Sequence, residues 1–575
     1  MLESVKDKDV RRQLLWFESG DPRKTLLLIR CSVWIATILA GFVQTWSLRF
    51  SLSPDGNSYL QIAGDYLRGD YATALNAYWS PMFSWLIAIG LKIFHPSGYW
   101  ETRFLHLLNF GGLLIALRCF EFFFAAFLAL LEHSRQPGGE PLLEDTHWWL
   151  LGYGLFFSTT LFVLTMEPTT PDIWVCVISY LAMGILLRIA IRPQKAGYFA
   201  AFGLVLGLGY LTKTFYFPLS FVFFGAALLT RGTFRKNFPG LMVSLVVFVF
   251  VAGPFVYAIS KAKHRFTFGD VGKIAYAEAV NPILGRPYWH GDTNSGIPKH
   301  PPRQILSSPR VYEFATPIKG THPLTDLSYW EEGIKPHFTF RGQLRILRQS
   351  SGTFFQLLLI QLEFAAGFFI LLMCQEQGHK FFATIARLWP IWLPAAAACL
   401  AYSVVLVENR YVAPFLVFLW LGAFAAVVSL PSAASRRVAI AVVLGVLCVT
   451  GIKAAKYFVS DLIMIPHQEN VYWDVAQNLP KIGIKPGDKV ALIASKAGIH
   501  WARLAGVQVV SEIPLGDDDV FWNADRATQE RAFTAFASTG SRAVVVKDPP
   551  RRAVNEGWIQ IGDTAYYTYL LPGKP

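Results

Sequence analysis

The chain has 575 residues, of which 53% are hydrophobic and only 16% are charged. Soluble proteins carry about a quarter charged residues, so this composition excludes a soluble globular protein over most of the chain and predicts a bilayer as its solvent. The net charge of +13 would suggest a nucleic-acid partner in a soluble protein; here the basic residues lie largely beside apolar segments, where they orient membrane helices and point to no nucleic acid.

Apolar runs recur along the chain, and a full span needs about 20 such residues. The first run follows a polar, charged start and is expected to be an uncleaved anchor. Together the runs predict an α-helical polytopic membrane protein with about 11–13 membrane helices. The predicted segments are 26–46, 79–94, 104–131, 147–165, 171–191, 198–212, 214–230, 238–260, 353–374, 386–406, 411–430 and 438–457.

Polar stretches divide the chain into domains. Residues 1–25 form an N-terminal segment, 26–457 a membrane domain that includes loops 47–78 and 262–352, and 458–575 a C-terminal region. In that last region, apolar runs such as 489–495 and 543–547 alternate with an amphipathic segment at 524–538. This alternation predicts a small soluble α/β domain with a parallel sheet. It contains no phosphate-cradling glycine motif, so we assign it no chemistry.

The basic residues also predict the orientation of the chain. Those between Lys6 and Lys24 place the N-terminus in the cytoplasm, and later groups, such as Arg436 and Arg437, mark further cytoplasmic turns. The loop 262–352 and the C-terminal region then lie outside, together with the candidate residues described below. Three apolar segments between Asp55 and Asp172 would separate these acids, so one must be re-entrant or interfacial. The candidates are 79–94, which is short, and 147–165, which glycine interrupts.

The first outer loop carries the candidate acid Asp55 in the sequence Ser53-Pro-Asp-Gly-Asn57. Apolar residues at helical spacing over 57–68 predict a helix along the membrane surface that would hold Asp55 above the bilayer. Asp65 is the next acid along this helix. The alternative is that Pro-Asp-Gly is only a turn.

Two further acids, Glu167 and Asp172, lie between apolar segments in the sequence Met166-Glu-Pro-Thr-Thr-Pro-Asp172. Ionisable groups at membrane depth are costly and usually functional. The alternative for Asp172 is an N-cap of the next helix, where an acid meets the helix dipole.

Two cations follow at the predicted outer boundary. Lys213 interrupts about thirty apolar residues and suits a phosphate partner, although a lysine there could simply snorkel to the surface. Arg410, which precedes Tyr411, heads a membrane helix on the outer face, against the positive-inside tendency. Phosphate binding would explain Arg410, and an ion pair with Glu408 or another acid is the alternative.

These sites together resemble the GT-C superfamily of polyprenyl-phosphate-dependent glycosyltransferases, in the branch of protein O-mannosyltransferases and lipid A aminoarabinose transferases. The resemblance covers roughly residues 20–460 and rests on Asp55 with the helix after it, Tyr78-Trp-Ser-Pro81, Asp172, the Gly207-Leu-Gly-Tyr-Leu-Thr-Lys213 segment, and Arg410-Tyr411 with Pro414. Two features depart from the family. Paired acids in the first loop are common there, whereas Gly56 follows Asp55 here, and the tail 458–575 matches no family motif.

The resemblance implies transfer of a sugar with inversion from a polyprenyl-phosphate donor to an acceptor hydroxyl on a glycan, lipid or protein. Asp55 would be the general base, and Lys213 and Arg410 would bind the departing phosphate. Asp172 would be the second catalytic acid and would orient the acceptor or hold a divalent cation. Glu167, Asp65 and Tyr411 are further candidates for acceptor or metal binding. A divalent metal ion is a candidate cofactor, and no nucleotide cofactor is expected. The implied location is the bacterial inner membrane, with a periplasmic active site among membrane lipids.

Two other classes of function compete with this interpretation. A transporter or flippase of lipid-linked or envelope glycan precursors would also carry ionisable residues in its membrane helices. In transporters these residues tend to lie near the bilayer midplane, whereas the candidates in this chain are predicted at one face. A non-catalytic assembly or scaffold protein is the third class. A cavity in which the two acids and two cations converge would argue against it.

Overall fold

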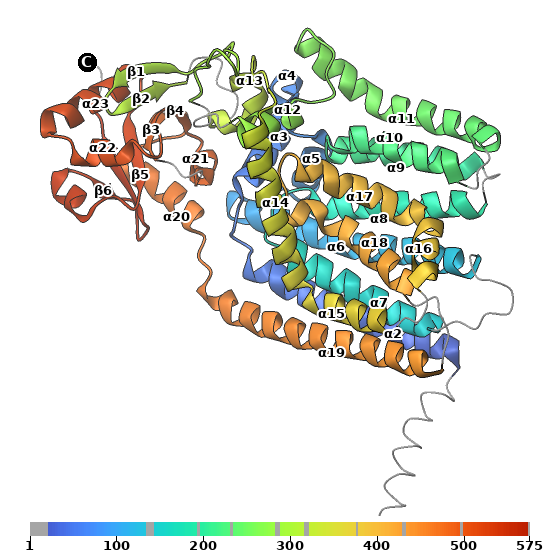
Figure 1. Cartoon of the computed structure of the whole chain (residues 1–575). Coiled ribbons are helices and arrows are strands. Elements are labelled where there is room, and N and C mark those ends of the chain that lie inside the picture. The colour runs from blue at the N-terminus through green and yellow to red at the C-terminus, as the bar shows by residue number, and fades with distance from the viewer. Residues whose placement is uncertain are drawn as a thin grey trace, which may run out of the picture.

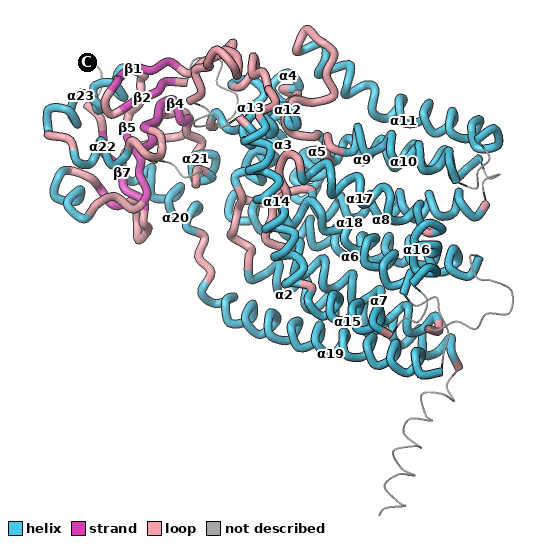
Figure 2. The backbone as a smooth tube through the Cα atoms, viewed as in Figure 1, coloured by secondary structure: helices cyan, strands magenta, loops and turns pink. Residues whose placement is uncertain are grey.

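The computed structural model describes residues 21–133, 143–192, 196–230, 234–281, 288–314, 321–374, 378–427, 433–494 and 498–572. A bundle of long helices forms one part of the molecule, and a small α/β domain lies at one end of it (Figures 1 and 2). We call this end of the bundle the domain end. Most of the predicted N-terminal segment 1–25 lies outside the described residues.

Within these residues, seven helices are long and apolar enough to cross a membrane, and two bent helix pairs would raise that number to nine. Each predicted apolar segment contains a helix, which confirms the predicted class of a polytopic helical membrane protein. The seven candidates are α2 (Pro22–Ser47), α6 (Gly98–His133), α7 (Asp145–Ser158) with the π-helical η1 (Thr159–Leu164), α8 (Asp172–Ile191), α11 (Phe234–Ala262), α18 (Asn409–Val427) and α19 (Ala433–Met464).

Three shorter apolar helices complete the bundle: α5 (Pro81–Phe94), α9 (Ala196–Thr212) and α10 (Tyr216–Leu229). At 1.5 Å per residue, the 14 residues of α5 extend about 21 Å, less than the hydrocarbon core. Both α6 and the continuous α7–η1 segment are long enough to cross. Between the two candidates for a segment that does not cross, length therefore favours α5. The helices after it bring the chain back to the domain end at Asp172.

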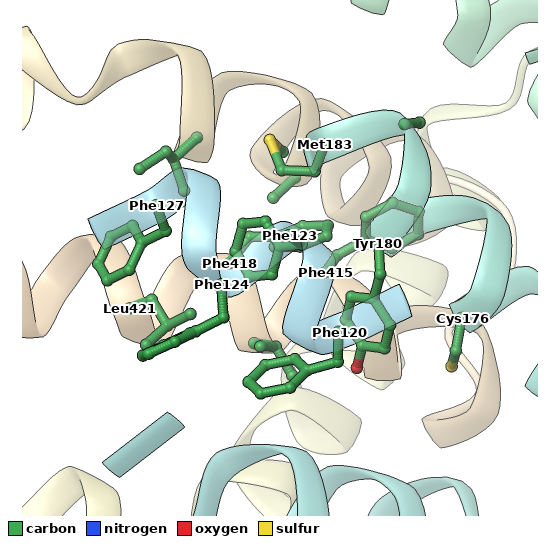
Figure 3. Packing of buried hydrophobic residues seen from close by; sticks show 14 of the residues in the cluster. Phe120, Phe123, Phe124, Phe127, Cys176, Tyr180, Met183, Phe415, Phe418 and Leu421 are labelled. Atoms are coloured by element: carbon green, nitrogen blue, oxygen red, sulfur yellow. The ribbon is translucent and has the colours of Figure 1, made fainter. Parts of the chain in front are cut away.

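Aromatic side chains form the centre of the bundle where α6, α8 and α18 meet (Figure 3). Phe120, Phe123 and Phe418 are fully buried. The rings of Phe123 and Phe418 meet edge to face with centroids 4.9 Å apart, a geometry that adds to the free energy of burial. This packing fixes the positions at which α8 and α18 begin, and both begin at the domain end.

The predicted span 353–374 is not one straight helix. The chain forms α14 (Phe340–Ile360) and α15 (Leu362–Met373), bent by 83° at Gln361. The Gln361 amide donates a hydrogen bond to Thr159 Oγ1 (3.1 Å) and accepts one from Trp420 Nε1 (2.9 Å). These bonds hold the polar residue inside the bundle, so α14 lies across the domain end while α15 enters the bundle (Figure 1). A second bent pair, α16 (Gly378–Arg387) and α17 (Trp389–Ser403), makes an 82° turn.

The C-terminal region folds as the α/β alternation predicts. Strands β3 (Lys489–Ile493), β4 (Gln508–Ile513) and β5 (Ala543–Lys547) are parallel, with β3 between the other two. The surrounding helices are α20 (Val471–Asn478), α21 (His500–Ala505), α22 (Asp518–Asn523) and α23 (Arg526–Ser538). Antiparallel β7 (Tyr566–Leu570) and β6 (Ile559–Gln560) extend the sheet beyond β5, so the sheet is mixed rather than purely parallel.

The predicted boundaries placed the loop 262–352 in the membrane domain, but part of this loop belongs to the C-terminal domain. It forms α12 (Val271–Val280) and α13 (Leu327–Trp330), and its strands β1 (Arg303–Ser307) and β2 (Arg310–Glu313) join the sheet through β4. The seven-stranded order is β1-β2-β4-β3-β5-β7-β6. A sheet built from two distant stretches ties this loop to the C-terminal domain, and the boundary at 458 does not separate them.

The α/β domain docks on α3 (Pro54–Arg68), the helix that starts at the candidate acid. His500 Nδ1 lies 3.2 Å from Asn57 Oδ1, and Arg503 pairs with Glu101 at 3.1 Å. The expected surface helix therefore exists, but its residues 56–65 are buried beneath the domain and loop rather than lying exposed on the membrane.

Close packing of α9 against α11 predicts a stability difference between two glycines of α9. A Cβ at Gly203 would lie 2.1 Å from the Ser244 carbonyl oxygen, whereas a Cβ at Gly197 would meet nothing within 4 Å. We expect Gly203→Ala to reduce the free energy of unfolding by about 1–3 kcal/mol through overpacking. Gly197→Ala should leave it unchanged or raise it slightly, because alanine favours the helix. Thermal unfolding of the purified variants in detergent makes the comparison, and equal melting temperatures would contradict it.

The docked histidine predicts a pH dependence of stability. Burial, with the charge of Arg503, lowers the pKa of His500 to about 3, below the usual value near 6.5 for an exposed histidine. Below pH 6.5, His500 therefore binds a proton in the unfolded chain but stays neutral in the folded chain. The free energy of unfolding consequently falls as the pH drops from about 6.5 towards 3. We expect His500→Gln to lose less thermal stability than the wild type between pH 7 and pH 5. Parallel pH profiles for the two proteins would rule this out.

Candidate functional site

A cavity of about 1110 Å³ opens at the domain end of the bundle. Its walls come from the start of α3, the chain before α5, the start of α8, the link between α9 and α10, the loop with α12, and α14. The start of α18 completes it. Among its lining residues are Asp55, Tyr59, Tyr78, Trp79, Ser80, Thr170, Asp172, Lys213, Arg265, Asp270, Lys273, Arg345, Glu408, Arg410 and Tyr411.

The first turn of α3 positions Asp55. Ser53 is the N-cap and its hydroxyl accepts a hydrogen bond from Gly56 N–H, which satisfies one of the free amides of the helix start. The same hydroxyl lies 3.0 Å from Thr169 Oγ1. A Cβ at Gly56 would lie 2.1 Å from Thr169 Oγ1, so only glycine lets the helix approach this closely. The start of α3 is thereby locked to the segment that precedes α8.

Asp172 is the first residue of α8, but the N-cap position belongs to Pro171 and no side chain caps this helix. The Asp172 carboxylate instead accepts hydrogen bonds from Lys213 Nζ (2.6 Å) and Thr170 Oγ1 (2.6 Å). Its side chain is 3% exposed. The capping alternative therefore does not describe Asp172, which is a buried acid with a cationic partner.

Lys213 lies in the short link between α9 and α10. It turns inward to Asp172 and stands over the Tyr411 ring, with Nζ 3.5 Å from the ring centroid. An ammonium held by a carboxylate and an aromatic face is confined more tightly than one that snorkels to the surface.

Arg410, near the start of α18, joins the two acids. Its Nη2 donates to Asp55 Oδ2 (3.1 Å), while its Nη1 lies 3.6 Å from Asp172 Oδ2. Glu408 is also close, at 3.6 Å from Nε. The ion-pair alternative, with Glu408 or another acid, is therefore what the structure shows: the partners of Arg410 are Asp55, Asp172 and Glu408.

Asp55, Arg410, Asp172 and Lys213 thus form a chain of alternating charge from four separate elements of the sequence. Two carboxylates and two cations balance one another in this cavity, and the burial of Asp172 makes its ion pairs stronger than they would be in bulk water. The cations line the cavity together with Asp55, the more exposed acid at 34%. Such a site can bind a phosphate through its cations while Asp55 faces a second ligand.

Two other predicted residues are not brought into this cluster. Glu167 is exposed and lies outside the cavity lining. Asp65 is buried lower on α3 and pairs with Arg68. In the part of the chain that the structure describes, no three His, Cys, Asp or Glu side chains gather as metal ligands would. Since the acids Asp55 and Asp172 already pair with cations, these residues do not fit a metal site.

Sequence reasoning missed several lining residues. Thr170, in the segment between Glu167 and Asp172, donates to Asp172 and accepts from Arg410 Nη1 (3.3 Å). Its neighbourhood in the sequence was a usable signal, because it lies beside a predicted catalytic acid. Arg265 and Lys273 also line the cavity, but they lie in a long polar loop where charged residues are common, and no sequence pattern distinguishes them.

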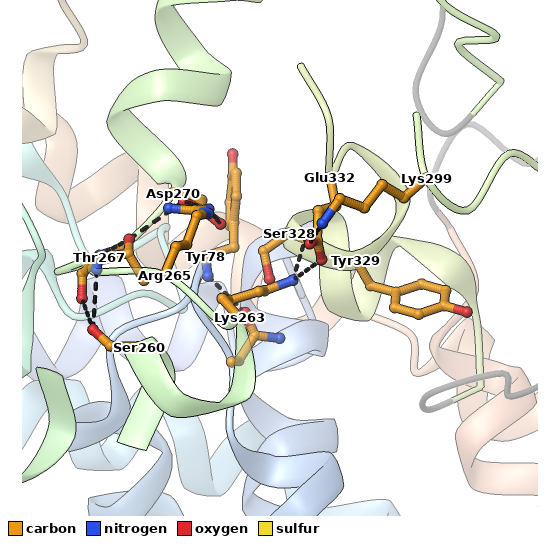
Figure 4. A network of polar contacts seen from close by, with 12 residues as sticks. Tyr78, Ser260, Lys263, Arg265, Thr267, Asp270, Lys299, Ser328, Tyr329 and Glu332 are labelled. Atoms are coloured by element: carbon orange, nitrogen blue, oxygen red, sulfur yellow. Dashed lines mark hydrogen bonds and ion pairs between the residues drawn. The ribbon is translucent and has the colours of Figure 1, made fainter. Parts of the chain in front are cut away.

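A polar network holds that loop over the cavity (Figure 4). Arg265 Nη2 donates to both oxygens of Asp270 at 2.5 and 2.7 Å, and Asp270 N–H bonds Ala77 O in the first loop at 2.7 Å. Farther along, Lys263 Nζ binds Glu332 (2.9 Å), which also pairs with Lys299. These contacts join the end of α11, the loop and the first-loop segment before α5 into one wall.

The structure is similar to ArnT from Cupriavidus metallidurans, a GT-C glycosyltransferase. The apo crystal structure aligns over 96% of this chain and 98% of that chain, with a TM-score of 0.51 and 14% identity. The form bound to undecaprenyl phosphate aligns over 95% and 99%, with a TM-score of 0.50 and 13% identity. The apo oligosaccharyltransferase of Archaeoglobus fulgidus aligns over 93% and 70%, with a TM-score of 0.46 and 12% identity. No protein-family model and no curated protein matches the sequence. The chain therefore has the fold of GT-C membrane enzymes, as its motifs predicted.

Proposed function

We propose that this multi-pass membrane protein is a glycosyltransferase that moves a sugar from a polyprenyl-phosphate donor to an acceptor hydroxyl. The reaction would take place at the domain end, on the periplasmic side of a bacterial inner membrane. The observation that carries the proposal is the Asp55–Arg410–Asp172–Lys213 chain in one cavity. It combines cations for a phosphate with an accessible carboxylate for a hydroxyl. The bound undecaprenyl phosphate of the structurally similar ArnT suggests the class of donor.

In the proposed reaction, the donor phosphate enters the cavity and takes Arg410 and Lys213 as partners. Arg410 binds the carboxylate of Asp55 in the structure. A phosphate that competes for Arg410 would free this carboxylate to accept a hydrogen bond from the acceptor hydroxyl. Arrival of the donor would thus make the general base available to the acceptor.

The bond changes follow an in-line displacement. The acceptor oxygen forms a bond to the anomeric carbon of the sugar on the face opposite the phosphate, while the bond from that carbon to the phosphate oxygen breaks. The hydroxyl proton passes to Asp55 as the new bond forms. Charge develops on the departing phosphate oxygen, where Lys213 and Arg410 stabilise it. Inversion at the anomeric carbon follows from attack on the opposite face.

Asp172 holds the two cations rather than the acceptor in this proposal. Its Oδ1 binds Lys213, and its Oδ2 binds Thr170 and approaches Arg410. With both oxygens engaged and the side chain buried, Asp172 has little capacity left for a substrate hydroxyl or a metal ion. It therefore acts as a positioning residue, and the proposed mechanism contains no step through a metal.

Replacing the proposed base should abolish transfer. We expect Asp55→Asn to lower the rate by about a hundredfold or more, because general-base catalysis contributes roughly 10²–10⁴-fold. Glu167→Gln is the matched control, because Glu167 is an exposed acid outside the cavity lining. The measurement compares envelope glycans by mass spectrometry in cells that lack the protein and carry wild type, Asp55→Asn or Glu167→Gln. A product restored equally by all three would remove Asp55 from the mechanism.

Loss of the lysine should weaken donor use in particular. We expect Lys213→Ala to raise the KM for the polyprenyl-phosphate donor about tenfold, equivalent to roughly 1.4 kcal/mol, with a smaller effect on the acceptor KM. Lys261→Ala, which removes an exposed lysine outside the cavity lining, serves as the control. Steady-state kinetics with each substrate varied in turn separates the two constants. An unchanged donor KM would show that Lys213 does not bind the phosphate.

A further inference from the structure

Helix α14 runs across the domain end of the bundle, steeply inclined to the helices beneath it (Figure 1). Its buried side chains, Ile346, Ser350 and Leu357, face the protein. The 83° bend at Gln361 separates it from α15, which enters the bundle. A helix placed this way lies along the level at which a bilayer meets water, not through the bilayer.

An apolar stripe runs along the outer surface of α14. Phe340, Leu344, Leu347, Phe355, Leu358 and Leu359 are all exposed. At 100° per residue the first five positions fall within an arc of about 80° on the helical circumference, and Leu359, in the last turn, lies about 40° beyond it. Large exposed apolar side chains aligned on one face of a surface helix are typical of a helix that dips into the acyl-chain boundary of a membrane.

A basic row lies beside this stripe. Arg341, Arg345 and Arg348 are exposed and occupy the next arc of about 60° around the helix. The sequence of α14 contains no Asp or Glu. Within the described residues these arginines form no ion pair, and Arg345 donates a hydrogen bond only to the Ala279 carbonyl at the end of α12 (2.7 Å). The helix thus presents apolar, basic and protein-facing sectors in sequence around its axis.

We propose that α14 is an interfacial helix whose arginine row binds the phosphate groups of anionic phospholipids in the leaflet at the domain end. The apolar stripe would anchor the helix among acyl chains, which sets the arginines at the level of the headgroups. Arginine suits this role because its planar guanidinium binds phosphate oxygens in pairs.

The length of the row favours a phospholipid layer over a single phosphate ligand. Arg341 and Arg348 are seven residues apart, which corresponds to about 10 Å along the helix. A single phosphate would contact both only if the two side chains converged on it, whereas extended side chains can each meet a separate headgroup of a leaflet. Arg345 and Gln349 also line the cavity, so the bound phospholipids would border its opening. This proposal concerns the surrounding membrane and does not depend on the reaction proposed above.

Lipid binding to the purified full-length protein tests the proposal. Native mass spectrometry would compare phosphatidylglycerol with phosphatidylcholine of the same acyl chains. We expect wild type to prefer the anionic lipid by about tenfold or more, since each basic residue near an anionic surface contributes roughly fivefold. Arg341→Gln/Arg345→Gln/Arg348→Gln should bind both lipids equally. The Arg341→Lys/Arg345→Lys/Arg348→Lys variant should keep most of the preference, because it keeps the charge.

A matched control removes three arginines from the far surface of the α/β domain: Arg526→Gln/Arg531→Gln/Arg542→Gln. It should retain the wild-type preference. An equal loss in this control would show a net-charge effect and overturn the proposal, as would a preference that survives in the α14 glutamine variant. Raising the salt from 50 to 500 mM should weaken the wild-type preference and tests the same point without substitution. If polyprenyl phosphate displaces the bound phosphatidylglycerol, the row is a substrate site and the proposal fails.

Discussion

The position of one guanidinium, between two carboxylates from distant parts of the chain, constrains most of this structure. Arg410 reaches Asp55 at the start of α3 and Asp172 at the start of α8, and Asp172 in turn holds Lys213. Four residues that span 355 positions of the chain can meet only if their helices all begin or end at the same face of the bundle. This requirement agrees with the short length of α5 and with the path of α6 and α7, which carry the chain away from the domain end and back to it.

Ionic groups at the edge of a membrane are costly unless they are paired, and here two acids and two cations satisfy one another. The balance also makes the site ready for an anion, because a phosphate can replace a carboxylate as the partner of Arg410. The surrounding structure keeps the chain of charges in place. Gly56 allows α3 to contact Thr169, and His500 and Arg503 hold the α/β domain against α3 and α6. The soluble domain, which carries no evident chemistry of its own, thereby supports the helix that bears Asp55.

Much of this arrangement could be predicted from the sequence, for physical reasons that also mark the limits. Long apolar runs predict membrane helices, and ionisable residues at the ends of such runs are conspicuous, so Asp55, Asp172, Lys213 and Arg410 could be identified one by one. Their meeting at one face was expected as well, but which acid pairs with which cation could not be predicted, because it depends on tertiary contacts that no local pattern records. The bend at Gln361 could not be predicted for the same reason, because it depends on hydrogen bonds of Gln361 with Thr159 and Trp420. Strands β1 and β2 join a sheet formed by residues about 200 positions later, and α3 is buried only because that domain covers it.

We propose that the cations of this cavity hold a lipid-linked phosphate while the Asp55 carboxylate is freed for the acceptor hydroxyl. The decisive measurement is a cryo-EM structure of the full chain in a lipid nanodisc with polyprenyl phosphate. We expect phosphate density within hydrogen-bond distance of Arg410 and Lys213, with the Asp55 carboxylate no longer bound to Arg410. Phosphate bound elsewhere, with Arg410 still paired to both acids, would show that these cations do not hold the donor.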